Sequence, residues 1–87
     1  MAPVTYQLFR DSFVLELSLD DQNGRFTVNC QPPAALDQED VQRQTRKWVA
    51  HVARGYNQRH RNGFSAAVQF LPCREPGILR GQILTSQ

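Results

Sequence analysis

The chain has 87 residues, of which 40% are hydrophobic and 21% are charged, and its formal net charge at pH 7 is +2. This length suits one small domain with a single core, so we expect residues 1–87 to fold as one unit. No apolar run approaches the roughly 18 residues of a membrane span, and the first four residues do not resemble a secretory signal, which predicts a soluble, cytoplasmic protein.

The charge is divided unevenly along the chain. Residues 1–40 carry 2 cations and 7 anions, a sum of −5, whereas residues 41–87 carry 8 cations and 1 anion, a sum of +7. If this division persists in the folded protein, the basic side will be attracted electrostatically to polyanions or acidic protein surfaces. The alternative is that the two halves neutralise each other on folding.

The N-terminal third alternates apolar and polar residues, which is the pattern of strands with one buried face. We expect strands over Val4–Phe9 and Phe13–Leu19. Asn23-Gly24 then favours a hairpin turn, because both residues tolerate positive φ, and a third strand is predicted over Arg25–Cys30. The side chains expected to face the core are Phe13, Leu15, Leu17, Leu19, Phe26, Val28 and Cys30.

Residues 36–60 form the one long helix that the sequence predicts, after an extended, polyproline-like crossing at residues 31–35. Asp37 is the candidate N-cap, and Asp40 stands at the capping-box position three residues on. Three acidic side chains in this first turn oppose the positive end of the helix dipole. The start of the helix is therefore well specified by the sequence.

At about 100° per residue, the helix has an apolar stripe on one side. Arg59 would fall back onto this stripe, so we expect the helix to end near Asn57. The stripe comprises Val41, Thr45, Trp48, Val49, Val52 and Tyr56.

The opposite side of the helix is strongly basic, and this character continues into the polar connector that follows. Glu39 can pair with Arg43, but no acidic residue occurs between Val41 and Arg74, so other carboxylate partners would have to come from the N-terminal half. The predicted contact surface comprises Arg43, Arg46, Lys47, Arg54, Arg59, His60 and Arg61.

Two further strands are expected after the helix. Asn62-Gly63 indicates a turn, and Phe64–Phe70 alternates like a half-buried strand. Pro76-Gly77 fits the central pair of a type II turn, and Ile78–Thr85 closes the chain as the last strand, with Gly81 as a candidate bulge.

The predicted order is ββ(β)-α-ββ, an α+β domain with one helix packed on one face of a mostly antiparallel sheet of four to five strands. A β-grasp fold has the same order of elements but a parallel central contact, and both arrangements are open at this point. Either one leaves an edge strand through which a partner or a second copy could pair as a homodimer.

No residue pattern typical of a catalytic, cofactor or metal site is present, so we expect no enzyme, no cofactor and no metal ion. Cys30 and Cys73 do not complete a zinc site with His51 and His60 at a recognisable spacing, and we expect free buried thiols, with a disulfide as the alternative. His51, between the two helix faces, is expected to hydrogen-bond or stack. Asp20-Asp21 is expected to be solvated in its turn.

The basic surface leads to two hypotheses about function. The favoured one is a non-enzymatic binding module whose basic helix face contacts an anionic surface, which is either nucleic acid or an acidic protein partner of a small regulator or inhibitor. The alternative is a dedicated DNA- or RNA-binding protein that contacts phosphates, since arginine binds phosphate bidentately. The phosphate contacts would come from Arg43, Arg46, Lys47, Arg54 and Arg61. A small enzyme is a remote third hypothesis.

Overall fold

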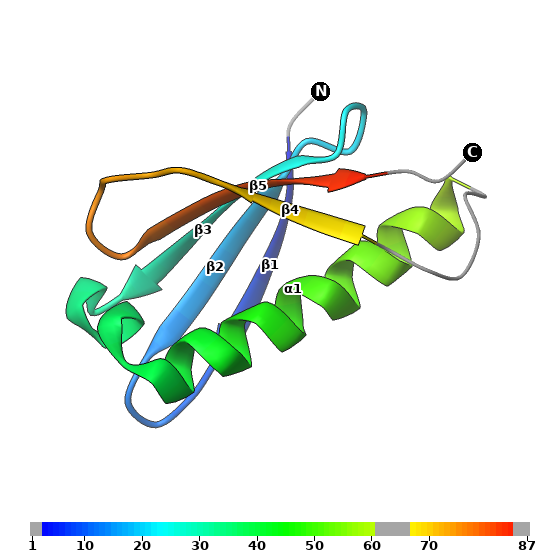
Figure 1. Ribbon diagram of the computed structural model, residues 1–87. Coiled ribbons are helices and arrows are strands. Elements are labelled where there is room, and N and C mark those ends of the chain that lie inside the picture. Colours follow the sequence, from blue (N-terminus) through cyan, green and yellow to red (C-terminus); the bar gives the residue numbers. More distant parts are fainter. Residues whose placement is uncertain (1–2, 61–66, 85–87) are drawn as a thin grey trace.

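The computed structural model describes residues 3–60 and 67–84, which form a five-stranded sheet, a short 3-10 helix and one long α-helix (Figure 1). The strands are β1 (Val4–Phe9), β2 (Val14–Leu19), β3 (Arg25–Gln31), β4 (Ala67–Leu71) and β5 (Ile78–Leu84). The helical segments are η1 (Pro33–Asp37) and α1 (Glu39–Arg59), and both lie between β3 and β4 in the chain.

The strand order in the sheet is β1-β2-β3-β5-β4, and every neighbouring pair is antiparallel. The chain leaves β3, crosses one face of the sheet as α1 and returns at the far edge as β4, after which a hairpin places β5 between β4 and β3. The predicted α+β fold with a mostly antiparallel sheet is confirmed. The β-grasp alternative is wrong, because the central contact between β3 and β5 is antiparallel.

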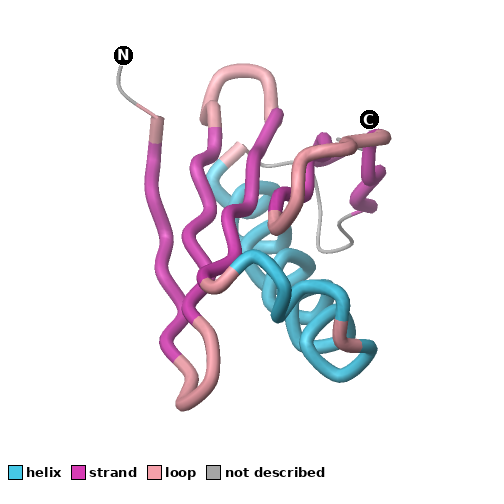
Figure 2. The backbone as a smooth tube through the Cα atoms, turned by 90° about the vertical axis from the view of Figure 1, so that its left-hand side faces the viewer, coloured by secondary structure: helices cyan, strands magenta, loops and turns pink. Residues whose placement is uncertain are grey.

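The core lies between the sheet and α1, which form two layers (Figure 2). All seven strand side chains expected in the core are buried. On α1, Val41, Thr45, Val49, Val52 and Tyr56 are buried as predicted, and the hydroxyl of Thr45 is satisfied by the Val41 carbonyl oxygen at 2.7 Å. Two helix residues that the stripe did not include, Ala53 and Asn57, are buried as well.

Trp48 departs from the predicted stripe, since it is only partly buried at the margin of the core. It lies on the side of α1 that faces the edge strand β1, where the sheet ends and the indole ring stays partly exposed. The helix therefore packs on the sheet through valine and tyrosine side chains, and Trp48 lies at the edge of this contact.

The beginning of α1 differs from the prediction. Residues 33–37 turn into the 3-10 helix η1 in place of an extended crossing, and the residue at the N-cap of α1 is Gln38. The Gln38 side chain makes no capping hydrogen bond, and the predicted Asp37 cap is wrong. Asp37 is instead the last residue of η1. This 3-10 helix begins at Pro33, whose ring fixes φ near the value of a helical turn.

The other end of α1 also differs, since the helix continues past Asn57 to Arg59. A contact with a distant carboxylate, described below, holds this last turn. The predictions for Arg61, for the Asn62-Gly63 turn and for the first residues of the strand from Phe64 lie outside the described residues, as does Thr85.

Two glycines behave as the turn patterns require, and a third does not. Gly24 and Gly77 have φ angles of +75° and +73°, and the N–H of Ile78 donates to the carbonyl of Glu75, as in the expected type II turn. Gly81 forms no bulge, because the register of β5 with both of its neighbours runs through it without interruption. Its role is to leave room for the Phe26 ring.

No helix within the described residues has the length and apolar character needed to cross a membrane.

Candidate interaction surface

The outward face of α1 carries three exposed cations, Arg43, Lys47 and Arg54, together with an exposed histidine, His51. Arg43 and Arg54 are separated by roughly 16 Å at about 1.5 Å per residue. Lys47 and Arg54 form no ion pair with the described residues. The side chain of His51 makes no hydrogen bond or ring contact with them, and the stacking or hydrogen-bonding role expected for it stays a prediction.

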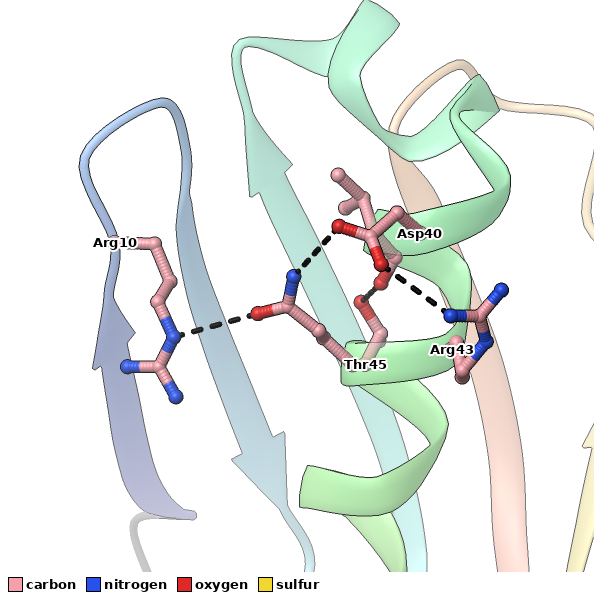
Figure 3. Close-up of polar contacts among 6 residues, drawn as sticks. Arg10, Asp40, Arg43 and Thr45 are labelled. Atoms are coloured by element: carbon pink, nitrogen blue, oxygen red, sulfur yellow. Dashed lines mark hydrogen bonds and ion pairs between the residues drawn. The ribbon is translucent and has the colours of Figure 1, made fainter.

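Arg43 is paired, but weakly. Its Nη1 atom lies 3.5 Å from Oδ1 of Asp40, and both side chains are more than half exposed. Ion pairs of this kind contribute about 0–1 kcal/mol, so an anionic partner can compete for Arg43 at little cost. The other oxygen of the same carboxylate accepts a hydrogen bond of 3.2 Å from Gln44, which itself accepts one of 3.4 Å from Arg10, the residue after β1. Figure 3 shows Arg10, Asp40 and Arg43 with dashed lines along this chain of contacts.

Arg46 does not belong to the outward face. Its guanidinium carbon lies 5.1 Å from the centre of the Phe70 ring, on the side of α1 that faces β4. Such a cation–π contact contributes about 0.5–1 kcal/mol at an exposed site. Arg46 therefore helps to hold α1 against β4, and changing it would affect the fold as well as any bound partner.

Arg59 and His60 are turned away from the outward face by Asp21 in the β2–β3 hairpin. Nη2 of Arg59 lies 3.0 Å from Asp21 Oδ1, and Nε2 of His60 lies 3.6 Å from Asp21 Oδ2. The hydrogen bond that Arg59 donates to Asp21 is the main cause of the raised pKa of Arg59. The His60 ring also packs on Tyr56, with 4.3 Å between ring centres.

This contact answers two of the sequence predictions. Asp21 is not merely solvated in its turn, because it holds the C-terminal end of α1 against the hairpin. The predicted seven-residue contact surface is therefore divided, with Arg59 in an ion pair with Asp21, His60 beside the same carboxylate, and Arg61 outside the described residues. Asp21 and Arg59 are 38 positions apart, so no local pattern in the sequence could have paired them.

Tyr56 is expected to make the stability of this end of α1 depend on pH. Burial, followed by the negative charges of Asp21 and Asp20, raises the pKa of the Tyr56 phenol above its ordinary value of 10.0. Because the folded pKa exceeds the unfolded one, the stabilisation by the neutral phenol is complete below about pH 10 and is lost as the pH rises through the folded pKa.

We expect the free energy of unfolding of the wild-type chain to fall more steeply above about pH 10 than that of Tyr56→Phe. Urea unfolding at a series of pH values measures both. Burial also raises the pKa of the Cys30 thiol, but this residue is present in both proteins and cancels in the comparison. Equal slopes would contradict the assignment to Tyr56.

A shallow groove between α1 and β1 was not predicted. It encloses about 260 Å³ and is lined by Leu8, Arg10, Gln44, Lys47 and Trp48. Its walls thus combine an aromatic and an aliphatic side chain with two cations, and none of the five is acidic. The sequence signals were an arginine directly after a strand and a tryptophan at the border of the apolar stripe, but only the packing of α1 beside β1 brings them together.

Two further hollows lie elsewhere. One, of about 620 Å³, is on the sheet face opposite α1 and includes Arg25 and Arg80. The other, of about 470 Å³, lies between η1, α1 and the β4–β5 turn and includes Cys73. Cys73 is partly exposed and Cys30 is buried, and both are free thiols, so the predicted burial holds for Cys30 only. Within the described ranges, no three His, Cys, Asp or Glu side chains gather in a way that would hold a metal ion.

Comparison with protein-family models, with curated proteins and with solved structures found no match.

Proposed function

We propose that this chain is a non-enzymatic binding module that docks the outward face of α1 on an acidic surface of a partner protein, in the manner of a small regulator or inhibitor. The observation that carries the proposal is the exposure of Lys47 and Arg54 with no ion-pair partner among the described residues, beside the weakly held Arg43. Such a face draws acidic surfaces towards it and orients them on encounter. The proposal keeps the cytoplasmic location expected from the sequence.

A protein partner has more support than a nucleic acid. A nucleic-acid site would use a continuous row of cations along the helix, but Arg59 and His60 are turned towards Asp21, and Arg46 lies over Phe70. The partly exposed tryptophan next to Lys47 also suits a protein, because tryptophan and arginine are enriched at the centres of protein interfaces.

The charge-reversal variant Lys47→Glu/Arg54→Glu tests the proposal. The matched control is Arg25→Glu/Arg74→Glu, which makes the same change in net charge at two exposed arginines that do not belong to α1. Neither Arg25 nor Arg74 forms an ion pair with the described residues. The probes are fluorescein-labelled poly-L-glutamate and a labelled DNA duplex, with binding followed by fluorescence anisotropy at several salt concentrations.

We expect poly-L-glutamate to bind the wild-type chain, the α1 variant to lose about tenfold or more in affinity, and the control variant to lose far less. Equal losses in the two variants would contradict the proposal, because net charge and not the α1 face would then control binding. Tighter binding of the duplex would favour the nucleic-acid hypothesis. The affinity should then fall with rising salt concentration, at a logarithmic slope of about one released counterion per neutralised phosphate.

A further inference from the structure

The strand β1 is an edge of the sheet, since among the described residues it pairs with β2 alone (Figure 2). The N–H of Arg10 donates to the carbonyl of Phe13 at 2.9 Å across the β1–β2 turn. Residue pairs in an antiparallel ladder alternate between hydrogen-bonded and non-hydrogen-bonded pairs. Every second residue counted back from Arg10 therefore bonds to β2 through its backbone, and the residues between them direct their backbone N–H and C=O groups away from β2. The residues whose N–H and C=O groups point away from β2 are Thr5, Gln7 and Phe9.

This edge has few of the features that usually prevent pairing. The strand has no charged residue and no proline between Val4 and Phe9, and its two end residues are exposed to 38% and 65%. One outward acceptor is occupied, because Nη1 of Arg10 donates to the Phe9 carbonyl at 3.0 Å. The outward groups of Thr5 and Gln7 form no hydrogen bond with the described residues.

The groove between β1 and α1 adjoins this edge. A strand added to β1 would turn every second side chain towards α1, where Leu8 and Trp48 offer an apolar contact and Arg10 and Lys47 offer positive charge. Among the described residues, the carboxylate that a hydrogen bond links to the groove is Asp40, which accepts from Gln44. The charge of the groove therefore complements an acidic strand.

We propose that β1 binds an extended, acidic segment of a partner protein by strand addition, with an apolar side chain of the segment against Trp48 and its carboxylates beside Arg10 and Lys47. This inference rests on the proposed function and names the form in which the acidic partner is recognised. Backbone hydrogen bonds to Thr5 and Gln7 provide the attachment, and the groove provides the selection of side chains.

A second copy of this chain is a poorer occupant of the edge. Two-fold pairing of β1 with β1 of another copy would keep both helices on one face of the joined sheet. In an antiparallel pair centred on Gln7, Arg10 of one copy would lie opposite Val4 of the other, and β1 has no acidic side chain to place beside Arg10 and Lys47. The charge of the groove thus selects an acidic segment over self-association.

The experiment uses a seven-residue probe, acetyl-Thr-Glu-Thr-Leu-Thr-Glu-Thr-amide, which places Glu, Leu and Glu on one face of an extended strand. The same peptide with Lys in place of Glu is the charge control. Binding is measured by ¹H–¹⁵N chemical shifts and by amide exchange, and also by the fluorescence of the chain's single tryptophan. We expect shifts at Thr5, Gln7 and Trp48, slower exchange of the Thr5 and Gln7 amides, and no binding of the Lys peptide.

Gln7→Pro isolates the backbone contact, because proline removes an N–H that points away from β2. Gln7→Thr is its matched control, since both variants lose the 3.1 Å hydrogen bond from the Gln7 side chain to Glu16 but only the proline variant loses the N–H. We expect Gln7→Pro to weaken binding of the Glu peptide about tenfold relative to Gln7→Thr. The shift and exchange maps of the wild-type chain decide the question without either variant if Gln7→Pro fails to fold.

Equal affinities of the two Gln7 variants, or no shifts in β1 at millimolar peptide, would overturn the inference. It would also fall if the free chain were a dimer that Gln7→Pro dissociates, which would assign the edge to a second copy. Failure of the proposed function is a separate result, because it appears as unchanged poly-L-glutamate binding in Lys47→Glu/Arg54→Glu. Loss of binding in that variant together with equal Gln7 variants would leave the proposed function standing and remove strand addition alone.

Discussion

Leu17→Ala is expected to lower the free energy of unfolding by about 2–5 kcal/mol, because it leaves a cavity in the centre of the core. Leu17 is 1% exposed and lies in β2 between Tyr6 of β1 and Val28 of β3. Strands flank it on both sides, so the surrounding side chains have little freedom to collapse into the space. For a domain of this size the midpoint of thermal unfolding should fall by roughly 10 °C or more.

The matched control is Leu84→Ala, which makes the same change on the face of the sheet opposite α1. Leu84 is 41% exposed, so we expect a loss of at most about 1 kcal/mol. Urea unfolding followed by circular dichroism measures both variants. Similar losses at Leu17 and Leu84 would contradict the assignment of the core to the α1 side of the sheet.

Gly81→Ala is expected to destabilise the protein by about 1–3 kcal/mol through overpacking. Gly81 in β5 stands opposite Phe26 in β3 and Phe70 in β4, whose rings meet edge to face with 6.0 Å between centres. A Cβ atom at Gly81 would collide with the Phe26 ring and would lie 2.7 Å from the carbonyl oxygen of Gln69. Neither the ring nor the backbone can move away without disturbing the two adjacent strands.

Gly55→Ala provides a control of opposite sign. The added methyl group would meet only the end of the flexible Arg59 side chain, at 3.6 Å. We expect this change to stabilise the protein by about 0.5–1 kcal/mol, because alanine favours the helix more than glycine does. Chemical unfolding of the two variants should therefore shift in opposite directions, and a stable Gly81→Ala protein would show that the Phe26 ring is free to move.

The strands were predictable because their signal is local. Alternation over Phe13–Leu19 and Arg25–Cys30 has the period of the β-strand itself, so it identified both the elements and their buried faces. The turns at Gly24 and Gly77 were predictable for the same reason, since positive φ is a property of single residues. Most of the buried stripe of α1 followed in this way as well.

The errors lie where a residue's role depends on a distant partner. Arg59 was predicted to end the helix by falling on the apolar stripe, yet Asp21 from a hairpin 38 positions earlier pairs with it there. Arg46 was counted among the outward cations, but Phe70 of β4 draws it to the flank of α1. Gly81 was predicted to form a bulge because glycine within a strand often does. The glycine is instead explained by the aromatic rings of the two neighbouring strands.

By itself, the sequence determined that this protein has an antiparallel sheet with one amphipathic helix and a surplus of positive charge on that helix. The reason is that hydrophobic period and charge are carried by neighbouring residues. The tertiary structure alone decided which cations remain free and which strand edge stays open. It also decided that Arg10, Lys47 and Trp48 share one groove, because these properties depend on which segments pack side by side.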